Sequence, residues 1–424
     1  MDSRGGPAHV AQTDVPTHPV DVILGRPTDS SVTMSVLGYV DMRGQVSYGT
    51  QNGRPTSLTP TARLSAGEPN EFVIDSLQPG TRYCYQFTYQ AGDSSGRVDG
   101  TFHTQRPPGS RFVFTVQADS HLDQNTSPEL YANTLRNALA DRPDFHVDLG
   151  DTFMTGKYRG DNPAELYLAQ RYYFGLLCHS APLFLVLGNH DGEPGGRGLD
   201  RTGAISLRKK YFPNPLPDDF YTGSHREEAG VGLLQNYYAW EWGDALFVVL
   251  DPFWYSARQR GERSNNWYRT LGDDQYHWLR QTLEASKARF KFVFIHHLVG
   301  GSDSGGRGGV EAAGFFEWGG KSLNGQRDFR AQRPGWEIPI HQMLVENRVS
   351  AVFHGHDHFF AKQDLDDIVY QLLPQPGHGR YGSVRSAREY GYVEGEILAG
   401  SGHPVSYTHL RAHETGRHIS YAVF

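Results

Sequence analysis

The sequence is poor in cysteine, in long apolar runs and in excess positive charge, and each shortage excludes a class of protein. Cys84 and Cys178 are the only cysteines in 424 residues, so neither a disulfide framework nor a zinc site made wholly of thiolates is possible. No stretch approaches the roughly eighteen consecutive apolar residues of a membrane span, which argues against an integral membrane protein. Lysine and arginine number 40 against 47 aspartate and glutamate residues. That balance lacks the basic excess of proteins that coat nucleic acids.

Histidine and glycine are abundant instead, at 20 and 49 residues. Many histidines with almost no cysteine indicate metal chemistry that uses nitrogen and oxygen ligands rather than sulfur. The length predicts two domains, or one large domain, with ample apolar core.

The first part of the chain has the pattern of a β-sandwich. Residues 1–18 show no signal-peptide pattern and are expected to be disordered. Residues 19–105 carry short alternating or β-branched runs broken by Gly, Pro and Asn, which predict an all-β domain. Residues 77–85 resemble the tyrosine corner of fibronectin type III modules, with Tyr83 as the corner residue. A Pro/Gly stretch at 105–110 predicts the domain boundary.

The pattern changes in residues 110–403, where short apolar runs alternate with helical stretches. The runs predict strands near 112–116, 145–149, 184–187, 245–250, 290–295 and 349–353, and the stretches predict helices near 128–140, 164–177, 274–288 and 338–346. Such alternation indicates an α/β domain. Two segments, 192–235 and 300–335, are expected to be long irregular loops, and loops of that length are usually functional.

Polar residues that suit metal binding follow these apolar runs. They are Asp119 and His121, Gly150 and Asp151, the run Gly188–Asp191, His296 and His297, and the run His354–His358. Because open α/β sheets bind ligands at the carboxyl ends of their strands, we expect these side chains to converge. A set of Asp, His and Asn without Cys suits two hard or borderline divalent ions.

These motifs resemble those of the calcineurin-like metallophosphoesterase superfamily, specifically members with the fibronectin-like N-terminal domain of purple acid phosphatases. The resemblance implies a four-layer αββα sandwich preceded by an all-β fibronectin III-like sandwich domain. It implies that one metal is bound by Asp119, His121, Asp151 and His358. It implies that the second metal is bound by Asp151, Asn189, His296 and His356, with Asp151 bridging.

The function implied by the resemblance is hydrolysis of phosphate mono- or diesters, small-molecule substrates, through attack of a metal-bound hydroxide. His190 matches the outer-sphere histidine of the family, which contacts substrate and is suited to protonate the leaving alkoxide. Asp191 either orients His190 or caps the following loop. True purple acid phosphatases have a tyrosine where this chain has Met154. We therefore expect two ions of the Fe, Mn or Zn type rather than a tyrosine-ligated ferric centre.

Several alternatives stay open from the sequence. His297 either contacts substrate or packs, and Arg307 either clamps an anionic group or is a solvated loop charge. A non-catalytic surface or binding protein is a second hypothesis, but all predicted ligand positions are filled. A nuclease is a third, and the net charge of −7 argues against it. Fusion to a fibronectin-like module usually accompanies export, so we expect a periplasmic or secreted protein.

Residues 405–424 are interpreted as foreign to the protein. Residues 405–414 read as the in-frame translation of a transposase-type sequencing adapter, and residues 419–424 resemble the outer adapter. We therefore expect residues 405–424 to pack poorly. Because family members continue into closing strands, we expect the α/β domain of 110–403 to be truncated at its C-terminal end.

Overall fold

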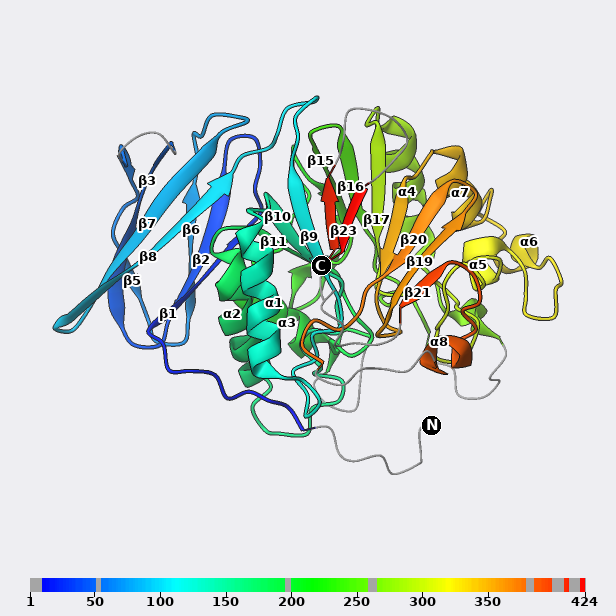
Figure 1. Ribbon diagram of the computed structural model, residues 1–424, viewed down its shortest axis with the longest axis horizontal. Helices are drawn as coiled ribbons and strands as arrows, with labels where there is room; N and C mark the ends of the chain where they lie inside the picture. Colours follow the sequence, from blue (N-terminus) through cyan, green and yellow to red (C-terminus); the bar gives the residue numbers. More distant parts are fainter. Residues whose placement is uncertain are drawn as a thin grey trace.

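The structure is a computed structural model that describes residues 10–50, 55–194, 200–257, 265–378, 385–398, 408–411 and 420–423. An all-β region lies at the left of Figure 1 and a larger α/β region at the right. No helix within the described ranges is long and apolar enough to cross a membrane.

The all-β region consists of two antiparallel sheets. One has the order β1 (Val20–Gly25), β2 (Val32–Gly38), β6 (Pro69–Ile74). The other is built on β3 (Met42–Thr50), β7 (Arg82–Ala91) and β8 (Ser94–His103), and β3 also pairs with β4 (Ser57–Leu58) and β5 (Ala62–Leu64). The Tyr83 hydroxyl accepts a hydrogen bond from the backbone N–H of Gln78 at 2.8 Å. A tyrosine corner makes this kind of bond to backbone a few residues upstream.

The α/β region contains two larger sheets. The first has the order β11 (Leu183–Leu185), β10 (Phe145–Asp148), β9 (Val113–Gln117), β22 (Thr408–Arg411), β23 (Ser420–Val423). The second has the order β12 (Thr222–Gly223), β15 (Tyr238–Trp242), β16 (Ala245–Val249), β17 (Phe290–Phe294), β18 (Ala351–His354), β20 (Ile368–Leu372), β19 (Phe360–Leu365), β21 (Glu396–Leu398). A short hairpin pairs β13 (Glu227–Glu228) with β14 (Gly232–Leu233).

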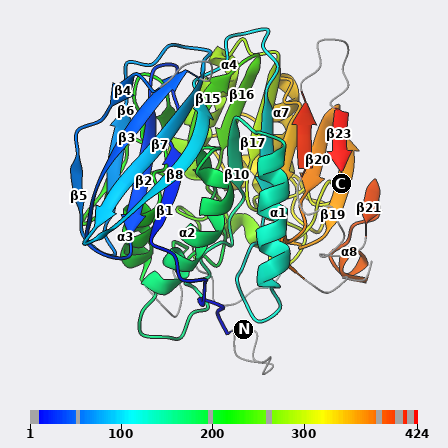
Figure 2. The same cartoon turned by 60° about the vertical axis from the view of Figure 1, so that its left-hand side comes forward.

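Helices cover the outer faces of the two sheets and complete the predicted four-layer αββα sandwich. On the side of the first sheet lie α1 (Pro128–Ala140), α2 (Ala164–Cys178) and α3 (Arg201–Tyr211). Figure 2 shows α1 and α2 in front of that sheet. On the side of the second sheet lie α4 (Gly272–Ala285), α5 (Phe316–Gly319), α6 (Phe329–Gln332) and α7 (Ile340–Glu346). The short η1 (Asn266–Tyr268) and α8 (Arg385–Glu389) complete the helices of the described ranges.

Every second residue of these strands faces the core between the two sheets, and many of these residues are aromatic. On β9, Phe114 and Val116 point into this core. Thr115 and Gln117 point the other way, and the Gln117 amide donates to the hydroxyl of Tyr131 on α1 at 3.0 Å. The rings of Phe114 and Phe145 stack with centroids 5.5 Å apart. This packing fixes the two sheets face to face, and their carboxyl-end loops meet at one edge.

One of the expected irregular segments contains a helix that the sequence analysis missed. Helix α3 lies inside 192–235, capped by Asp200, whose carboxylate accepts from the backbone N–H of Gly203 at 2.6 Å. Its length of 11 residues and the glycine in its first turn weaken the apolar periodicity that reveals longer helices. Segment 300–335 contains only the short α5 and α6.

The N-terminal segment is partly ordered, which differs from the expected disorder of 1–18. The backbone N–H of Gln12 donates to the carbonyl of Leu122 at 2.7 Å, and the Gln12 side chain donates to the carbonyl of Thr126 at 2.7 Å. These bonds tie residues 10–12 to the loop after β9. Residues 1–9 lie outside the described residues.

The two regions share buried polar contacts. Arg171 of α2 is fully buried, and its guanidinium donates to the hydroxyl and the carbonyl of Ser35 on β2, both at 3.1 Å. The Tyr85 hydroxyl of β7 donates to the carbonyl of His179 at 2.6 Å. Asp144 accepts from the Arg106 side chain at 2.7 Å, which ties the linker to the start of β10.

The C-terminal segment differs from the expectation of poor packing where it is described. Thr408–Arg411 pairs antiparallel with β9, and Ser420–Val423 pairs with Thr408–Arg411. Backbone pairing at a strand edge needs no particular side chains, since an edge presents unpaired N–H and C=O groups to any extended segment. The foreign origin of 405–424 therefore stays a prediction, and the remainder of the segment lies outside the described residues.

Candidate metal centre

The predicted ligands lie together at the carboxyl ends of two sets of parallel strands. β9, β10 and β11 are parallel in the first sheet, and β16, β17 and β18 are parallel in the second. The loops that follow them carry Asp119 and His121, Asp151, Asn189 and His190, His296, and His356 and His358. Because the sheets pack face to face, the loops of both converge on one site.

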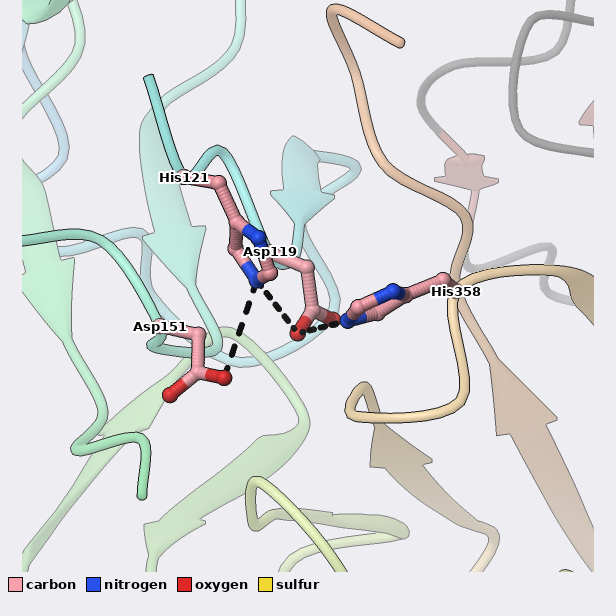
Figure 3. A group of neighbouring side chains, drawn as sticks. All are labelled: Asp119, His121, Asp151 and His358. Atoms are coloured by element: carbon pink, nitrogen blue, oxygen red, sulfur yellow. Dashed lines mark ion pairs between the residues drawn. The ribbon is translucent and has the colours of Figure 1, made fainter. Parts of the chain in front are cut away.

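The first cluster contains Asp119, His121, Asp151 and His358, whose ligand atoms all lie within 4.8 Å of one another (Figure 3). His358 Nε2 is 3.3 Å from Asp119 Oδ1. His121 Nε2 is 3.6 Å from Asp119 Oδ1 and 3.6 Å from Asp151 Oδ2. Two atoms bound to one ion at about 2.1 Å are roughly 3–3.5 Å apart. The spacing therefore fits a common ion.

The second cluster contains Asp151, His296 and His356 and thus shares Asp151 with the first. His296 Nε2 is 3.5 Å from Asp151 Oδ2 and 3.1 Å from the side-chain oxygen of Asn189. A carboxylate shared by two clusters is the arrangement that can bridge two cations.

Unpaired buried atoms support metal binding. Asp119 Oδ1 and His121 Nε2 are buried and have no hydrogen-bond partner. A buried polar atom without a partner is costly, so such atoms usually face something that satisfies them. Oxygen and imidazole donors of this kind suit Fe, Mn or Zn. The residues therefore fit a pair of divalent ions.

Backbone carbonyls orient two of the metal-site imidazoles. His296 Nδ1 lies 2.8 Å from the carbonyl of Leu149, and His356 Nε2 lies 3.0 Å from the carbonyl of Gly305. Because a carbonyl only accepts, each of these ring nitrogens carries the proton, and the other nitrogen is free to coordinate. The sequence motifs did not reveal Gly305, since any residue has a carbonyl.

The ligand loops have strained backbones. Asp119, His121, Asp151, His356 and His358 have positive φ angles of 59°, 45°, 54°, 75° and 65°. Non-glycine residues rarely adopt this region, and each such residue costs on the order of 1–3 kcal/mol. The surrounding contacts must supply that energy, which concentrates strain where the ligands converge.

Close backbone approach explains two of the motif glycines. A Cβ at Gly188 would lie 2.0 Å from the backbone nitrogen of Asp151. A Cβ at Gly355 would lie 2.5 Å from Asp119 Oδ2. Only glycine lets these loops pack this tightly against the ligand carboxylates.

The structure places Asp191 under the loop of Asp151. Its Oδ2 accepts from the backbone N–H groups of Asp151 at 3.0 Å and Gly188 at 2.8 Å. Its Oδ1 accepts from those of Thr152 and Phe153, both at 2.8 Å. Burial and the nearby Asp151 raise the pKa of Asp191 to about 7, while the backbone amides favour the charged form. These bonds indicate that Asp191 holds a loop rather than orienting His190. The loop that it holds carries Asp151 and precedes Asp191 in the chain, whereas the sequence suggested the loop that follows.

His190 lies at the mouth of the site. Its Nε2 is 4.0 Å from Asp151 Oδ2, and 28% of its side chain is exposed, against 1% for Asp151. Its backbone N–H donates to Asp151 Oδ1 at 2.7 Å. Burial lowers the pKa of His190 to about 3, so the ring is neutral at pH 7 before an anion binds. A neutral ring beside the clusters can donate its N–H to a bound phosphate.

Electrostatics keep the two carboxylates charged. Burial opposes ionisation of Asp119, but the imidazoles of His358, His121 and His296 outweigh it and hold its pKa well below the usual value. Burial also opposes ionisation of Asp151, and His296 and His190 likewise hold its pKa low. Both groups are therefore anionic at neutral pH.

His297 is packed rather than open. It is buried, its Nδ1 lies 2.9 Å from the carbonyl of Leu298, and its Nε2 accepts from Arg269 at 3.2 Å. Both ring nitrogens thus have partners, which favours the packing alternative. Burial, with the Arg269 charge next, lowers the pKa of His297 well below its ordinary value.

Arg307 is paired with acidic residues. Its guanidinium lies 3.6 Å from Asp303 and 3.7 Å from Asp357, and it stacks over the ring of Tyr390 at 4.5 Å. Met154, at the position of the tyrosine of purple enzymes, is fully buried.

Comparison with known proteins gives a family match and, among its fold matches, the following two. The model of the family described as calcineurin-like phosphoesterase matches residues 112–360, more than half of the chain. Comparison with curated protein sequences finds no match. The structure titled "Structure of PhoD" aligns with a TM-score of 0.63 and 14% identity over 94% of this chain and 85% of that chain. Purple acid phosphatase PPD1 from yellow lupin (Lupinus luteus) seeds aligns with a TM-score of 0.59 and 13% identity over 92% of this chain and 69% of that chain. Likeness at these identities concerns the fold alone.

Proposed function

Because the chain belongs to the calcineurin-like phosphoesterase family, we propose that it is a binuclear metal-dependent hydrolase of phosphate mono- or diesters. The observation that carries the proposal is Asp151, whose carboxylate is shared by both ligand clusters. Two bound cations would supply the positive charge that polarises phosphate oxygens and makes a coordinated water acidic.

The protein residues divide the remaining work. We assign Asp119, His121, Asp151 and His358 to one ion, and Asp151, Asn189, His296 and His356 to the other. Asp191 holds the Asp151 loop through four backbone amides. His190 is exposed enough to meet substrate and close enough to Asp151 to face the scissile phosphate. A phosphate anion bound beside it would raise the pKa of His190, and the resulting imidazolium would then donate a proton to the leaving oxygen.

The test removes the shared carboxylate and one ligand from the second cluster. Asp151→Asn and His356→Ala should abolish hydrolysis of 4-nitrophenyl phosphate and bis(4-nitrophenyl) phosphate by the manganese-loaded protein, with folding retained in circular dichroism. His277→Ala is the matched control, since His277 is exposed on α4. Wild-type activity in both ligand variants would reject the assignment. The ratio of rates on the two substrates separates monoesterase from diesterase preference.

We also propose that the all-β region is a fibronectin III-like module and that the protein acts in the periplasm or outside the cell. The Tyr83 corner bond and the two-sheet arrangement support the first statement. Cell fractionation with an antibody tests the second, and protein confined to the cytoplasmic fraction would reject it.

A further inference from the structure

Arg269 lies next to the histidines of the candidate centre but belongs to none of the predicted motifs. Its Nη1 donates to His297 Nε2 at 3.2 Å. The His297 ring lies 5.1 Å from the His356 ring, measured between centroids. One imidazole therefore separates the guanidinium from a ligand of the second cluster.

The charge of Arg269 is not balanced by a carboxylate within the part of the chain that the structure describes. Three other arginines of the α/β region each face a carboxylate: Arg208 pairs with Glu193, Arg333 with Glu317 and Arg307 with Asp357. The partners of Arg269 are instead neutral, namely His297, the carbonyl of Ser304 at 3.0 Å and the ring of Tyr268. Its Nε is buried and has no hydrogen-bond partner.

The guanidinium is fixed in place by the loop that crosses it. A Cβ at Gly306 would lie 2.9 Å from Arg269 Nη1 and 3.3 Å from His297 Cε1, so the loop passes directly over both side chains. The preceding residue, Gly305, gives its carbonyl to His356. The same loop therefore contacts both His356 and Arg269.

An unbalanced cation beside a site for two further cations is unfavourable until an anion arrives. We propose that the substrate of this centre is a phosphate ester with a second anionic group, a phosphate or a carboxylate, and that Arg269 binds that second group. This rests on the proposed function, since the scissile phosphate is taken to bind at the two clusters. Arginine suits the role because its fork of N–H groups matches the paired oxygens of either anion. Arg307 is less suited, since Asp303 and Asp357 already balance it.

Binding without turnover is the first test. The manganese-loaded protein is titrated with methylenediphosphonate and with methylphosphonate, which share one phosphonate and differ in the second. The wild type should bind methylenediphosphonate about tenfold or more tightly than methylphosphonate, and Arg269→Gln should bind the two ligands nearly equally. Arg269→Lys should retain part of the difference. Arg330→Gln, an exposed arginine of α6, is the matched control and should behave as the wild type. Equal binding of the two ligands by the wild type, or an unchanged difference in Arg269→Gln, would overturn the proposal.

Turnover measurements show whether the second anionic group is a phosphate or a carboxylate. They also separate a failure of the anion site from a failure of the proposed function. If the second group is a phosphate, Arg269→Gln should lower kcat/KM about tenfold or more on an alkyl bisphosphate. If it is a carboxylate, the same loss should appear on 4-carboxyphenyl phosphate. On phenyl phosphate, which has no second anion, the loss should be less than about threefold. Equal losses on all three substrates would show that Arg269 acts on the scissile phosphate, which contradicts the proposal. If the wild type binds the diphosphonate selectively but hydrolyses no ester, the proposed function fails and the anion site stands.

Discussion

The role of Asp191 can be decided by replacing one of its oxygens. In Asp191→Asn an NH₂ group stands where a carboxylate oxygen now accepts two backbone N–H bonds, whichever way the amide turns. Two bonds are lost, and donors face donors. Each hydrogen bond to a charged group contributes about 1.5–3 kcal/mol, so the variant should lose about 3–6 kcal/mol of unfolding free energy. A whole domain has only about 5–15 kcal/mol.

The same bonds hold the loop that carries Asp151, so the substitution should also weaken metal binding. The assay combines urea unfolding at pH 8, where Asp191 is ionised, with the metal content of each chain after dialysis. Asp218→Asn is the matched control, since Asp218 is exposed and accepts two backbone N–H bonds from Phe220 and Tyr221. It should shift the unfolding midpoint far less and leave metal content unchanged.

The alternative role makes the opposite forecast. If Asp191 served to orient His190, Asp191→Asn would keep full metal content and the wild-type unfolding midpoint. Its activity would then fall as far as that of His190→Asn. That combination of results would refute the loop-holding argument.

Three other substitutions and conditions follow from the described contacts. Gly188→Ala places a Cβ against the backbone of Asp151 and should cost about 3 kcal/mol of unfolding free energy in a urea titration; an unchanged midpoint would contradict it. Burial raises the pKa of Asp251 to about 6, so folding favours its protonated form, and stability should rise as pH falls through 6. Relative to Asp251→Asn, the wild type should gain about 2 kcal/mol between pH 7.5 and 4.5, measured by urea unfolding at both values, and parallel pH profiles would be evidence against this. Manganese at about a hundredfold excess over its Kd should stabilise the metal-free wild type by about 2.7 kcal/mol, seen as a higher Tm that His356→Ala lacks; an equal rise in that variant would show binding elsewhere.

The fold and the clustering of the candidate ligand residues could be predicted from the sequence because both depend on local patterns. Apolar runs followed by Asp, Asn or His mark strand ends such as those before Asp151 and His296, and parallel strands bring their ends together. The family match and the fold likenesses confirm the α/β architecture and the family.

Contacts between residues far apart in the chain could not be predicted. Gly305 acts through a carbonyl, and Arg269 lies 28 positions from His297, in a short turn with no motif. Asp191 accepts only from backbone N–H groups, which every residue but proline has, so its partners leave no trace in the sequence. The sequence therefore could not decide whether Asp191 orients His190 or holds a loop. Helix α3 was missed because its periodicity is weak, although its Asp200 cap was a usable signal.

The Pro/Gly linker at 105–110 divides the sequence, but the contacts of the structure do not divide with it. Residues 10–12 precede the β-sandwich and yet brace the loop that carries His121, and Ser35 satisfies the buried Arg171 of α2. A recombination event or an expression clone cut at the linker would remove both supports and leave the Arg171 guanidinium without its Ser35 partners. The β-sandwich and the α/β region thus depend on each other for these contacts, and a design that transplants either one has to replace them.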